Sequence, residues 1–255
     1  MSFFAALQFL TIIPLPWRRE VSPAELGHST AYFPLVGLII GLILLGWRWL
    51  LGLFLPPEVA NVLVIATLVL FSGALHLDGL LDTFDGIAGH GSVEERWRAM
   101  RDSRAGGIGV IAVCCLLLVK FVSLNSIPDA VLGKALVLMP VVSRWAMAYA
   151  IFAYPYARPD GLGKAFKEAT RWLRFTVATV VTFVVAVFLF PLPGLTFPLS
   201  ALLLLMASWI LVVTMAAYLR SKFAGLTGDT YGAINEVIEV SVLIIILVLD
   251  RLGLS

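Results

Sequence analysis

The sequence predicts an all-α, polytopic integral membrane protein with about seven transmembrane helices. Hydrophobic residues make up 60% of the 255 residues and charged residues only 13%, whereas soluble domains carry roughly 25% charged residues. Apolar stretches of the length needed to cross a bilayer, about 20 residues per helix, follow one another from end to end with short polar gaps between them. We therefore expect residues 1–255 to form a single integral membrane domain.

The apolar stretches are expected to form spans at about residues 31–55, 58–75, 107–127, 130–153, 175–191, 197–218 and 235–250. Arg48 interrupts the first of these spans. The same span contains Gly37, Gly41 and Gly46 in a GxxxG-like arrangement. Such spacing is typical of a helix face that packs closely against another helix.

The distribution of basic residues predicts which polar gaps face the cytoplasm. Thirteen of the 18 Lys and Arg residues lie in four gaps, at residues 16–30, 76–106, 154–174 and 219–234. The intervening gaps at 56–58, 128–129 and 191–194 contain none. By the positive-inside rule, the four basic gaps are cytoplasmic. The net charge of +2 is too small to indicate a nucleic-acid partner.

Four polar clusters begin in these cytoplasmic gaps, and they contain the residue types suited to catalysis and ligand binding. They are HLDGLLDTFDG at 76–86, RDSRAGG at 101–107, YARPDGLGK at 156–164 and GLTGDTYGAINEVIE at 225–239. Because all four start on the same side of the membrane, we expect them to converge on one active site facing the cytoplasm. No P-loop motif is present, so any nucleotide must be bound in another way.

The first cluster contains three carboxylates that a helix would place on one face. If residues 76–86 continue the preceding helix, Asp78, Asp82 and Asp85 lie at relative angles of about 0°, 40° and −20°, and His76 points elsewhere. Three acids on one stripe repel one another unless a cation lies against them. Magnesium is the obvious candidate, since it binds through one or two carboxylates plus substrate phosphates. The alternative is a solvated helix end that carries acids for solubility.

The second cluster contains cations suited to phosphate. Arg101 and Arg104 flank Asp102, and arginine binds phosphate oxygens bidentately. Alone, this cluster would more simply be a basic anchor before a helix, with Ser103 as its N-cap. Beside the acidic stripe, cations for phosphate and anions for metal are complementary, and this combination is typical of phosphoryl transfer.

Further charged residues fall within or at the edge of predicted spans. Asp229, Glu236 and Glu239 lie around the start of the last span, whereas Lys120 and Arg144 lie inside the third and fourth. Charges in hydrocarbon are costly unless they are paired or face a polar cavity. We therefore expect Arg144 to be a functional or ion-paired residue, and Lys120 to be either paired or a long side chain that reaches the interface.

These motifs resemble the cobalamin-5'-phosphate synthase family, also called adenosylcobinamide-GDP ribazoletransferases. The resemblance rests on FLTIIPLP at 9–16, YFPLVG at 32–37 and the four polar clusters, in order over nearly the whole chain. It implies a multi-pass, magnesium-dependent phosphoryl-group transferase in the bilayer of a bacterial or archaeal cytoplasmic (inner) membrane. The substrates implied are adenosylcobinamide-GDP and α-ribazole or its 5'-phosphate, with GMP released. A homo-oligomer is left open.

The resemblance also implies roles for individual residues. Asp78, Asp82 and Asp85 would bind Mg²⁺ that bridges the pyrophosphate, or Asp82 or Asp85 would instead orient the attacking hydroxyl. Arg101 and Arg104 would stabilise charge on the transferring and leaving phosphates. The expected substrate-binding residues are Arg144, Asp102, Ser103, Asp229 and Glu236.

Other membrane proteins fit the sequence less well. A CDP-alcohol phosphotransferase should have an alanine-arginine pair after its first DG, and a prenyltransferase of the UbiA kind should have two separated NDxxD-type motifs; this sequence has neither. A transporter would line a path at both ends instead of gathering four polar clusters on one face.

Overall fold

The computed structural model describes residues 2–14, 22–102, 104–189 and 199–254, and these residues form helices joined by short turns. In the described ranges the elements are α1 (Ser2–Leu10), α2 (Pro23–Ser29), η1 (Thr30–Tyr32), α3 (Phe33–Gly52), α4 (Pro57–Phe71), α5 (Leu75–Ala88), α6 (Val93–Ala99), α7 (Gly107–Ser126), α8 (Asp129–Ala153), α9 (Leu162–Ala169), α10 (Trp172–Leu189), α11 (Leu199–Phe223) and α12 (Gly228–Arg251). The all-α prediction is confirmed.

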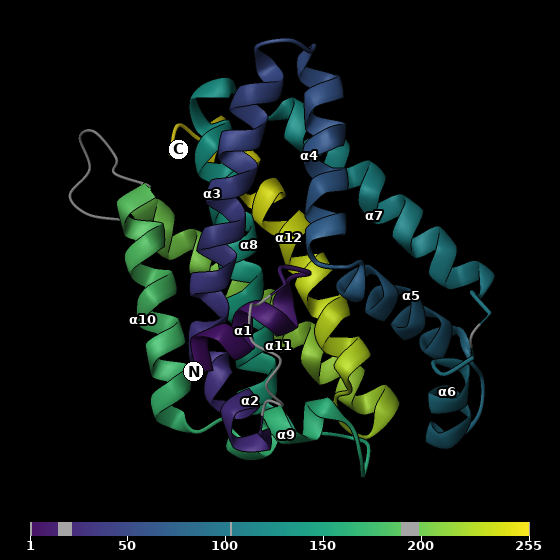
Figure 1. Cartoon of the computed structure of the whole chain (residues 1–255). Helices are drawn as coiled ribbons and strands as arrows, with labels where there is room; N and C mark the ends of the chain where they lie inside the picture. The colour runs from purple at the N-terminus through teal and green to yellow at the C-terminus, as the bar shows by residue number, and fades with distance from the viewer. Residues whose placement is uncertain (1, 15–21, 103, 190–198, 255) are drawn as a thin grey trace.

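The number of membrane spans also agrees with the prediction. Within the described residues, six helical segments are long and apolar enough to cross a bilayer, and the pair α4 and α5 qualifies as a seventh only when taken together. Figure 1 shows α2, α6, α9 and the first turn of α12 toward one end of the bundle. The α3–α4 turn and the C-terminus lie toward the other end. Of the elements that carry the polar clusters, α9 and the start of α12 lie toward the first of these ends, whereas α5 lies at mid-height (Figure 1).

The helix expected at 58–75 is shorter than predicted, because the chain turns sharply after Phe71. Gly73 and Ala74 both have left-handed backbone angles, with φ of +61° and +58°, and α5 leaves α4 at an angle of 85°. The assumption that residues 76–86 continue the preceding helix is therefore wrong. The acidic residues still lie on a helix, since α5 has 14 residues of its own, too few to cross a bilayer.

The last span starts earlier than the predicted residue 235. Thr227 caps α12, and its hydroxyl accepts a hydrogen bond from the Thr230 backbone N–H at 3.3 Å. This cap starts the helix at Gly228. Asp229 therefore belongs to the first turn of α12 and Glu236 lies two turns further along it, inside the bundle and not in a loop.

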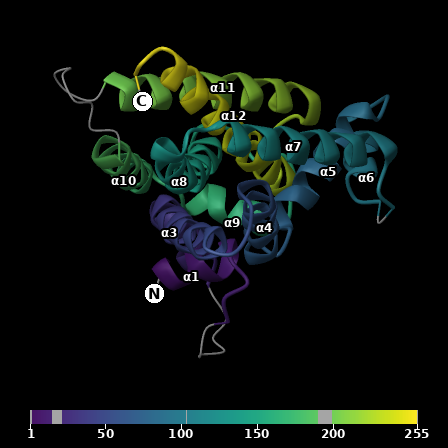
Figure 2. The same ribbon diagram turned by 90° about the horizontal axis from the view of Figure 1, so that it is seen from above.

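Helix α8 forms the centre of the bundle. Most of its residues are buried, and Figure 2 shows it between α3 on one side and α11 and α12 on the other. The α3 backbone approaches α8 at Gly37 and Gly41, where an added Cβ would lie 2.3 Å from the Pro140 carbonyl oxygen and 2.7 Å from Val137 Cα. The predicted close packing is confirmed for these two glycines, whereas Gly46 faces open space.

Arg48 is accommodated by polar partners on neighbouring helices. Its Nε donates to Asn61 Oδ1 on α4 at 2.7 Å, and Asn61 Nδ2 donates to Asn125 Oδ1 on α7 at 3.0 Å. This chain of hydrogen bonds joins three helices, and it explains how a charged residue is tolerated in the first span.

We expect Gly37→Ala to destabilise the bundle by about 1–3 kcal/mol, because the added methyl group overpacks the α3–α8 contact. Gly46→Ala is the matched control, since nothing lies within 4 Å of its Cβ position. Thermal unfolding in detergent measures both. An equal loss in the two variants would show that the α3–α8 contact does not depend on Gly37.

Candidate active site

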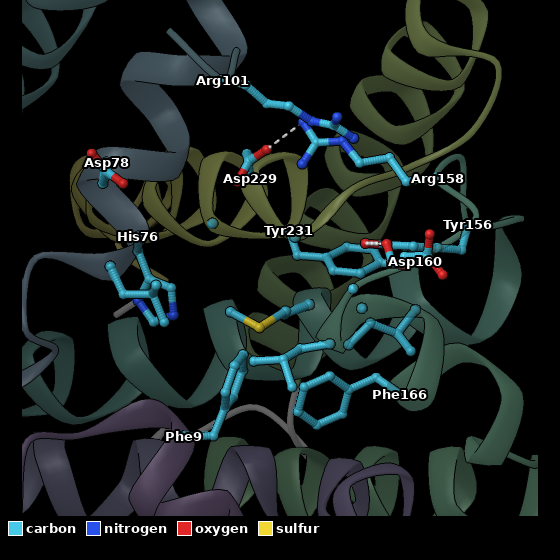
Figure 3. A pocket seen from close by; sticks show the side chains of 18 residues that line it. Phe9, His76, Asp78, Arg101, Tyr156, Arg158, Asp160, Phe166, Asp229 and Tyr231 are labelled. Carbon is cyan, nitrogen blue, oxygen red and sulfur yellow. Dashed lines mark hydrogen bonds and ion pairs between the residues drawn. The ribbon is translucent and has the colours of Figure 1, made fainter. Parts of the chain in front are cut away.

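A cavity of about 440 Å³ opens where α5, α9 and α12 meet the segment that follows α8. Figure 3 shows its polar side chains on one side and an apolar floor that includes Phe9 and Phe166, whose ring centroids are 4.6 Å apart. The charged residues that line it are Asp78, Arg101, Arg158, Asp160 and Asp229. The cavity thus places carboxylates and guanidinium groups around one space.

Two glycines allow α5 and α12 to cross closely enough to share this cavity. A Cβ on Gly79 would lie 2.7 Å from the Asp229 carbonyl oxygen, and one on Gly232 would lie 3.1 Å from His76 Cα. The backbones are therefore nearly in contact. As a result, Asp78 from α5 and Asp229 from α12 both line the cavity, although 151 positions separate them in the sequence.

Asp82 lies one turn beyond Asp78 on α5 and is half-buried. Burial, followed by the nearby charges of Asp78, Asp229 and Asp85, raises the pKa of Asp82 to about 7. The carboxylates of α5 and α12 thus create an excess of negative charge, as the sequence predicted for a stripe of acids. In the described residues, no three Asp, Glu, His or Cys side chains are arranged as a ready-made metal site.

Asp85 has a different environment from the other two acids of the stripe. Its Oδ2 accepts the Gly106 N–H at 2.7 Å and its Oδ1 accepts the Gly109 N–H at 2.8 Å. The carboxylate therefore binds the N-terminus of α7, where unpaired N–H groups and the helix dipole favour an anion. A Cβ at Gly106 would lie 2.3 Å from Asp85 Oδ1, and one at Gly109 would lie 2.8 Å from Asp85 Oδ2, which explains these two glycines of the RDSRAGGIG segment.

Arg158 was not among the predicted site residues, although the YARPDGLGK cluster that contains it was. Its guanidinium forms an ion pair with Asp229 at 2.9 Å. Two backbone hydrogen bonds hold the segments together: Ala157 N–H donates to Leu226 O at 2.8 Å and Leu226 N–H donates to Pro155 O at 2.9 Å. The clusters at 156–164 and 225–239 are therefore joined directly, and a pairing between segments so far apart could not be read from either one.

The structure separates the members of the RDSRAGG cluster. Arg101 lines the cavity, whereas Arg104 is exposed and binds Asp102 with two contacts of 2.9 and 3.1 Å. Hydrogen bonds from Arg104 lower the pKa of Asp102 to about 2. The Arg104–Asp102 pair does not line the cavity, and Ser103 lies outside the described residues.

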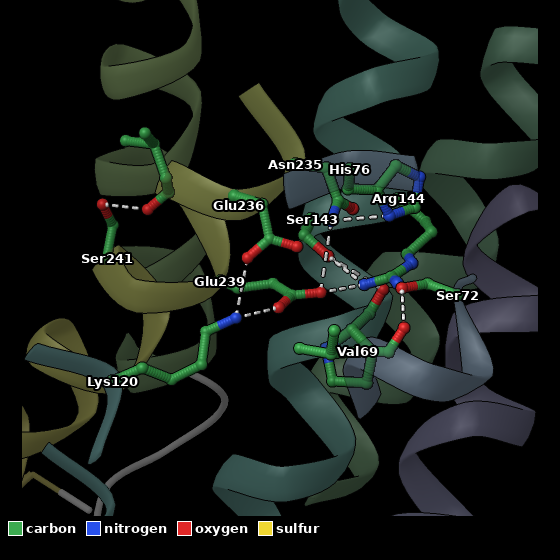
Figure 4. A network of polar contacts seen from close by, with 12 residues as sticks. Val69, Ser72, His76, Lys120, Ser143, Arg144, Asn235, Glu236, Glu239 and Ser241 are labelled. Carbon is green, nitrogen blue, oxygen red and sulfur yellow. Dashed lines mark hydrogen bonds and ion pairs between the residues drawn. The ribbon is translucent and has the colours of Figure 1, made fainter. Parts of the chain in front are cut away.

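Arg144 and Glu236 do not line the cavity either; they belong to an ion network inside the bundle (Figure 4). Lys120 donates to Glu236 Oε2 at 2.9 Å and to Glu239 Oε2 at 2.6 Å. Arg144 binds the other oxygen of Glu239. All four side chains are at most 5% exposed. Two cations and two anions from α7, α8 and α12 thus pair, as charges within hydrocarbon require.

His76 connects this network to the cavity, although the sequence interpretation set it aside. Asn235 Nδ2 lies 3.3 Å from both His76 Nδ1 and Glu239 Oε1. The carboxylate of Glu239 can only accept, so the Asn235 atom between them is the amide nitrogen, which can only donate. His76 Nδ1 therefore accepts a hydrogen bond from Asn235, and the neutral ring carries its proton on Nε2. That nitrogen is buried without a hydrogen-bond partner among the described residues, and the ring lines the cavity.

The different environments of Asp82 and Asp85 predict opposite effects on stability. Asp85→Asn leaves one α7 N–H without its acceptor, which costs about 1–3 kcal/mol. Asp82→Asn removes repulsion with Asp78 and Asp229, so the unfolding temperature should stay the same or rise. Thermal unfolding with a chelator present measures both variants. A larger loss for Asp82→Asn than for Asp85→Asn would contradict these assignments.

Comparison with known proteins shows the family of this chain. The model of the cobalamin-5-phosphate synthase family matches residues 2–247. The adenosylcobinamide-GDP ribazoletransferase of Roseiflexus sp. is 40% identical over 92% of this chain and 85% of its own length. The protein of the same name from Geotalea daltonii is 37% identical over 93% of both chains. No solved structure matches the chain. The chain belongs to the cobalamin-5-phosphate synthase family.

Proposed function

We propose that this protein transfers the cobinamide-linked phosphoryl group of adenosylcobinamide-GDP to a hydroxyl of α-ribazole or its 5'-phosphate. The observation that carries this proposal is the cavity in which Asp78 and Asp229 lie beside Arg101 and Arg158. Acids that attract a divalent cation and arginines that bind phosphate are the groups needed to hold a pyrophosphate. The relatives described above carry the name of this activity.

We propose that Asp78, Asp82 and Asp229 bind magnesium together with the substrate. Magnesium commonly uses one or two carboxylates and completes its coordination with water and substrate phosphates, so a preformed cage of three protein ligands is unnecessary. The raised pKa of Asp82 reflects burial and neighbouring negative charge, which a cation would offset. When bound, the ion would neutralise charge on the pyrophosphate and on the departing phosphate.

The reaction forms one phosphorus–oxygen bond and breaks another. The hydroxyl oxygen of the ribazole bonds to the cobinamide-linked phosphorus and releases its proton, the bond to the bridging oxygen of the pyrophosphate breaks, and GMP leaves with that oxygen. We assign charge stabilisation to Arg101 and Arg158, because both line the cavity and Arg104 does not. Asp85 receives no role at the reacting atoms, because both of its oxygens already accept backbone N–H groups.

We propose that the cavity faces the cytoplasm of a bacterial or archaeal cell. The end of the bundle with α6 and α9 carries basic residues of the described gaps, and the opposite end carries the α3–α4 turn, which has no Lys or Arg (Figure 1). The positive-inside rule assigns the first end to the cytoplasm.

The direct test is to incubate the purified protein with adenosylcobinamide-GDP, α-ribazole and Mg²⁺. We expect GMP and the cobalamin product in equal amounts, none without acceptor, and loss of turnover when a chelator removes the metal. Release of GMP without the cobalamin product would indicate hydrolysis, and it would contradict the proposed transfer.

Asp78→Asn tests the proposed site within this assay. It should lower turnover by about 100-fold or more, because the cation proposed to offset the charge on the transferring group would lose one of its carboxylate ligands. Asp129→Asn is the matched control, since Asp129 lies in the first turn of α8 and does not line the cavity. Equal activity in the two variants would exclude Asp78 from the site.

A further inference from the structure

A second cavity, also about 440 Å³, lies on α6 and the turn that follows it. Glu94, Trp97 and Arg98 line it from successive positions on one face of α6, and Arg101 and Asp102 complete it. Arg101 also lines the first cavity. The two cavities therefore share Arg101 in their linings.

Three charged side chains of this second cavity differ from their neighbours in having no partner among the described residues, whereas Asp102 is paired with Arg104. Arg96 donates to the Gly86 and Ile87 carbonyl oxygens at 3.2 and 2.9 Å, and the Glu95 carboxylate accepts the Ser92 N–H at 2.8 Å. These two side chains fix the ends of α5 and α6. By contrast, the side chains of Glu94, Arg98 and Arg101 form no hydrogen bond or ion pair among the described residues.

We infer that this second cavity binds the guanosine monophosphate part of the substrate, an assignment that rests on the proposed function. A carboxylate can accept both the N1–H and the 2-amino group of guanine, while an aromatic ring offers a surface for the base. Glu94 and Trp97 supply these two features, and Trp97 Nε1 is buried without a hydrogen-bond partner among the described residues. Adenine would present an acceptor to Glu94 at the same edge, and it would be rejected.

The position of Arg101 between the two cavities determines how the substrate is oriented in this proposal. With guanosine against α6, the pyrophosphate crosses the wall that the two cavities share, so its phosphates contact Arg98 and Arg101. The cobinamide-linked phosphorus then lies on the side of Asp78 and Asp229. GMP would therefore leave through the second cavity, away from the helix core, while the acceptor occupies the first.

The test uses Glu94→Gln and the binding of nucleotide monophosphates to the purified protein, measured by calorimetry. Xanthine carries an oxygen where guanine has its 2-amino group, so a carboxylate repels it and an amide can donate to it. We expect the parent protein to prefer GMP over XMP by tenfold or more. Glu94→Gln should lose about tenfold in GMP affinity and gain in XMP affinity, since a charge-assisted hydrogen bond is exchanged for a neutral one.

Two control variants make this result specific. Glu95→Gln alters the adjacent carboxylate, which caps α6, and should leave the preference for GMP over XMP unchanged. Arg98→Gln should weaken both nucleotides by a similar factor, because it contacts phosphate and not the base. Equal binding of GMP and XMP by the parent, or parallel losses for both in Glu94→Gln, would overturn the inference.

The inference and the proposed function fail in different ways. If the parent protein converts adenosylcobinamide-GDP but Glu94→Gln leaves base preference unchanged, guanine is recognised elsewhere and the transferase activity stands. If the parent binds GMP with the predicted base preference but forms no cobalamin product, the second cavity is a guanine nucleotide site and the proposed reaction is wrong.

Discussion

The ion network around Glu239 is the constraint on which the rest of the structure depends. One carboxylate, fully buried, binds Lys120 from α7 with one oxygen and Arg144 from α8 with the other. Removing any one partner would leave an unpaired charge in an apolar interior, which is strongly unfavourable. The network therefore locks α12 against two other helices at a fixed depth and rotation.

This fixed position of α12 determines where the site forms. Because Asp229 lies in the first turn of the same helix, the network also sets the height of Asp229 and the rotation of Gly232 toward α5. Asn235 extends the network to His76 on α5, so both helices that supply carboxylates are tied to the same buried charges. Asp85 joins α5 to the N-terminus of α7. Since Lys120 joins α7 to α12, the three helices are connected to one another in pairs. Local geometry at the cavity and helix packing in the membrane are thus coupled.

The sequence predicted those features that depend on local pattern and overall charge. The length of the apolar stretches predicted the spans, and the distribution of Lys and Arg predicted which polar gaps share a side of the membrane. Helical periodicity placed Asp78, Asp82 and Asp85 on one helix. It could not predict the break at Gly73 and Ala74, because alanine rarely adopts the left-handed conformation and only its tertiary surroundings hold it there.

Contacts between segments far apart in the sequence could not be predicted from it either. Asp85 resembles its two neighbours in sequence, yet it binds backbone amides of a helix more than twenty residues away. Arg158 was overlooked because its partner Asp229 lies on another element. Glu236 was expected in the site because it belongs to the same polar cluster as Asp229, but two helical turns carry it into the bundle, where Lys120 pairs with it.

The central claim is that carboxylates of α5 and α12 bind one divalent cation, and iron-directed cleavage tests it most directly. With Fe²⁺ replacing Mg²⁺, ascorbate and peroxide generate radicals that cut the backbone beside the bound ion, and mass spectrometry locates the cuts. We expect cleavage near Asp78 and Asp82 on α5 and near Asp229 on α12, with both suppressed together by excess Mg²⁺. Cleavage confined to one of the two helices would contradict a shared site.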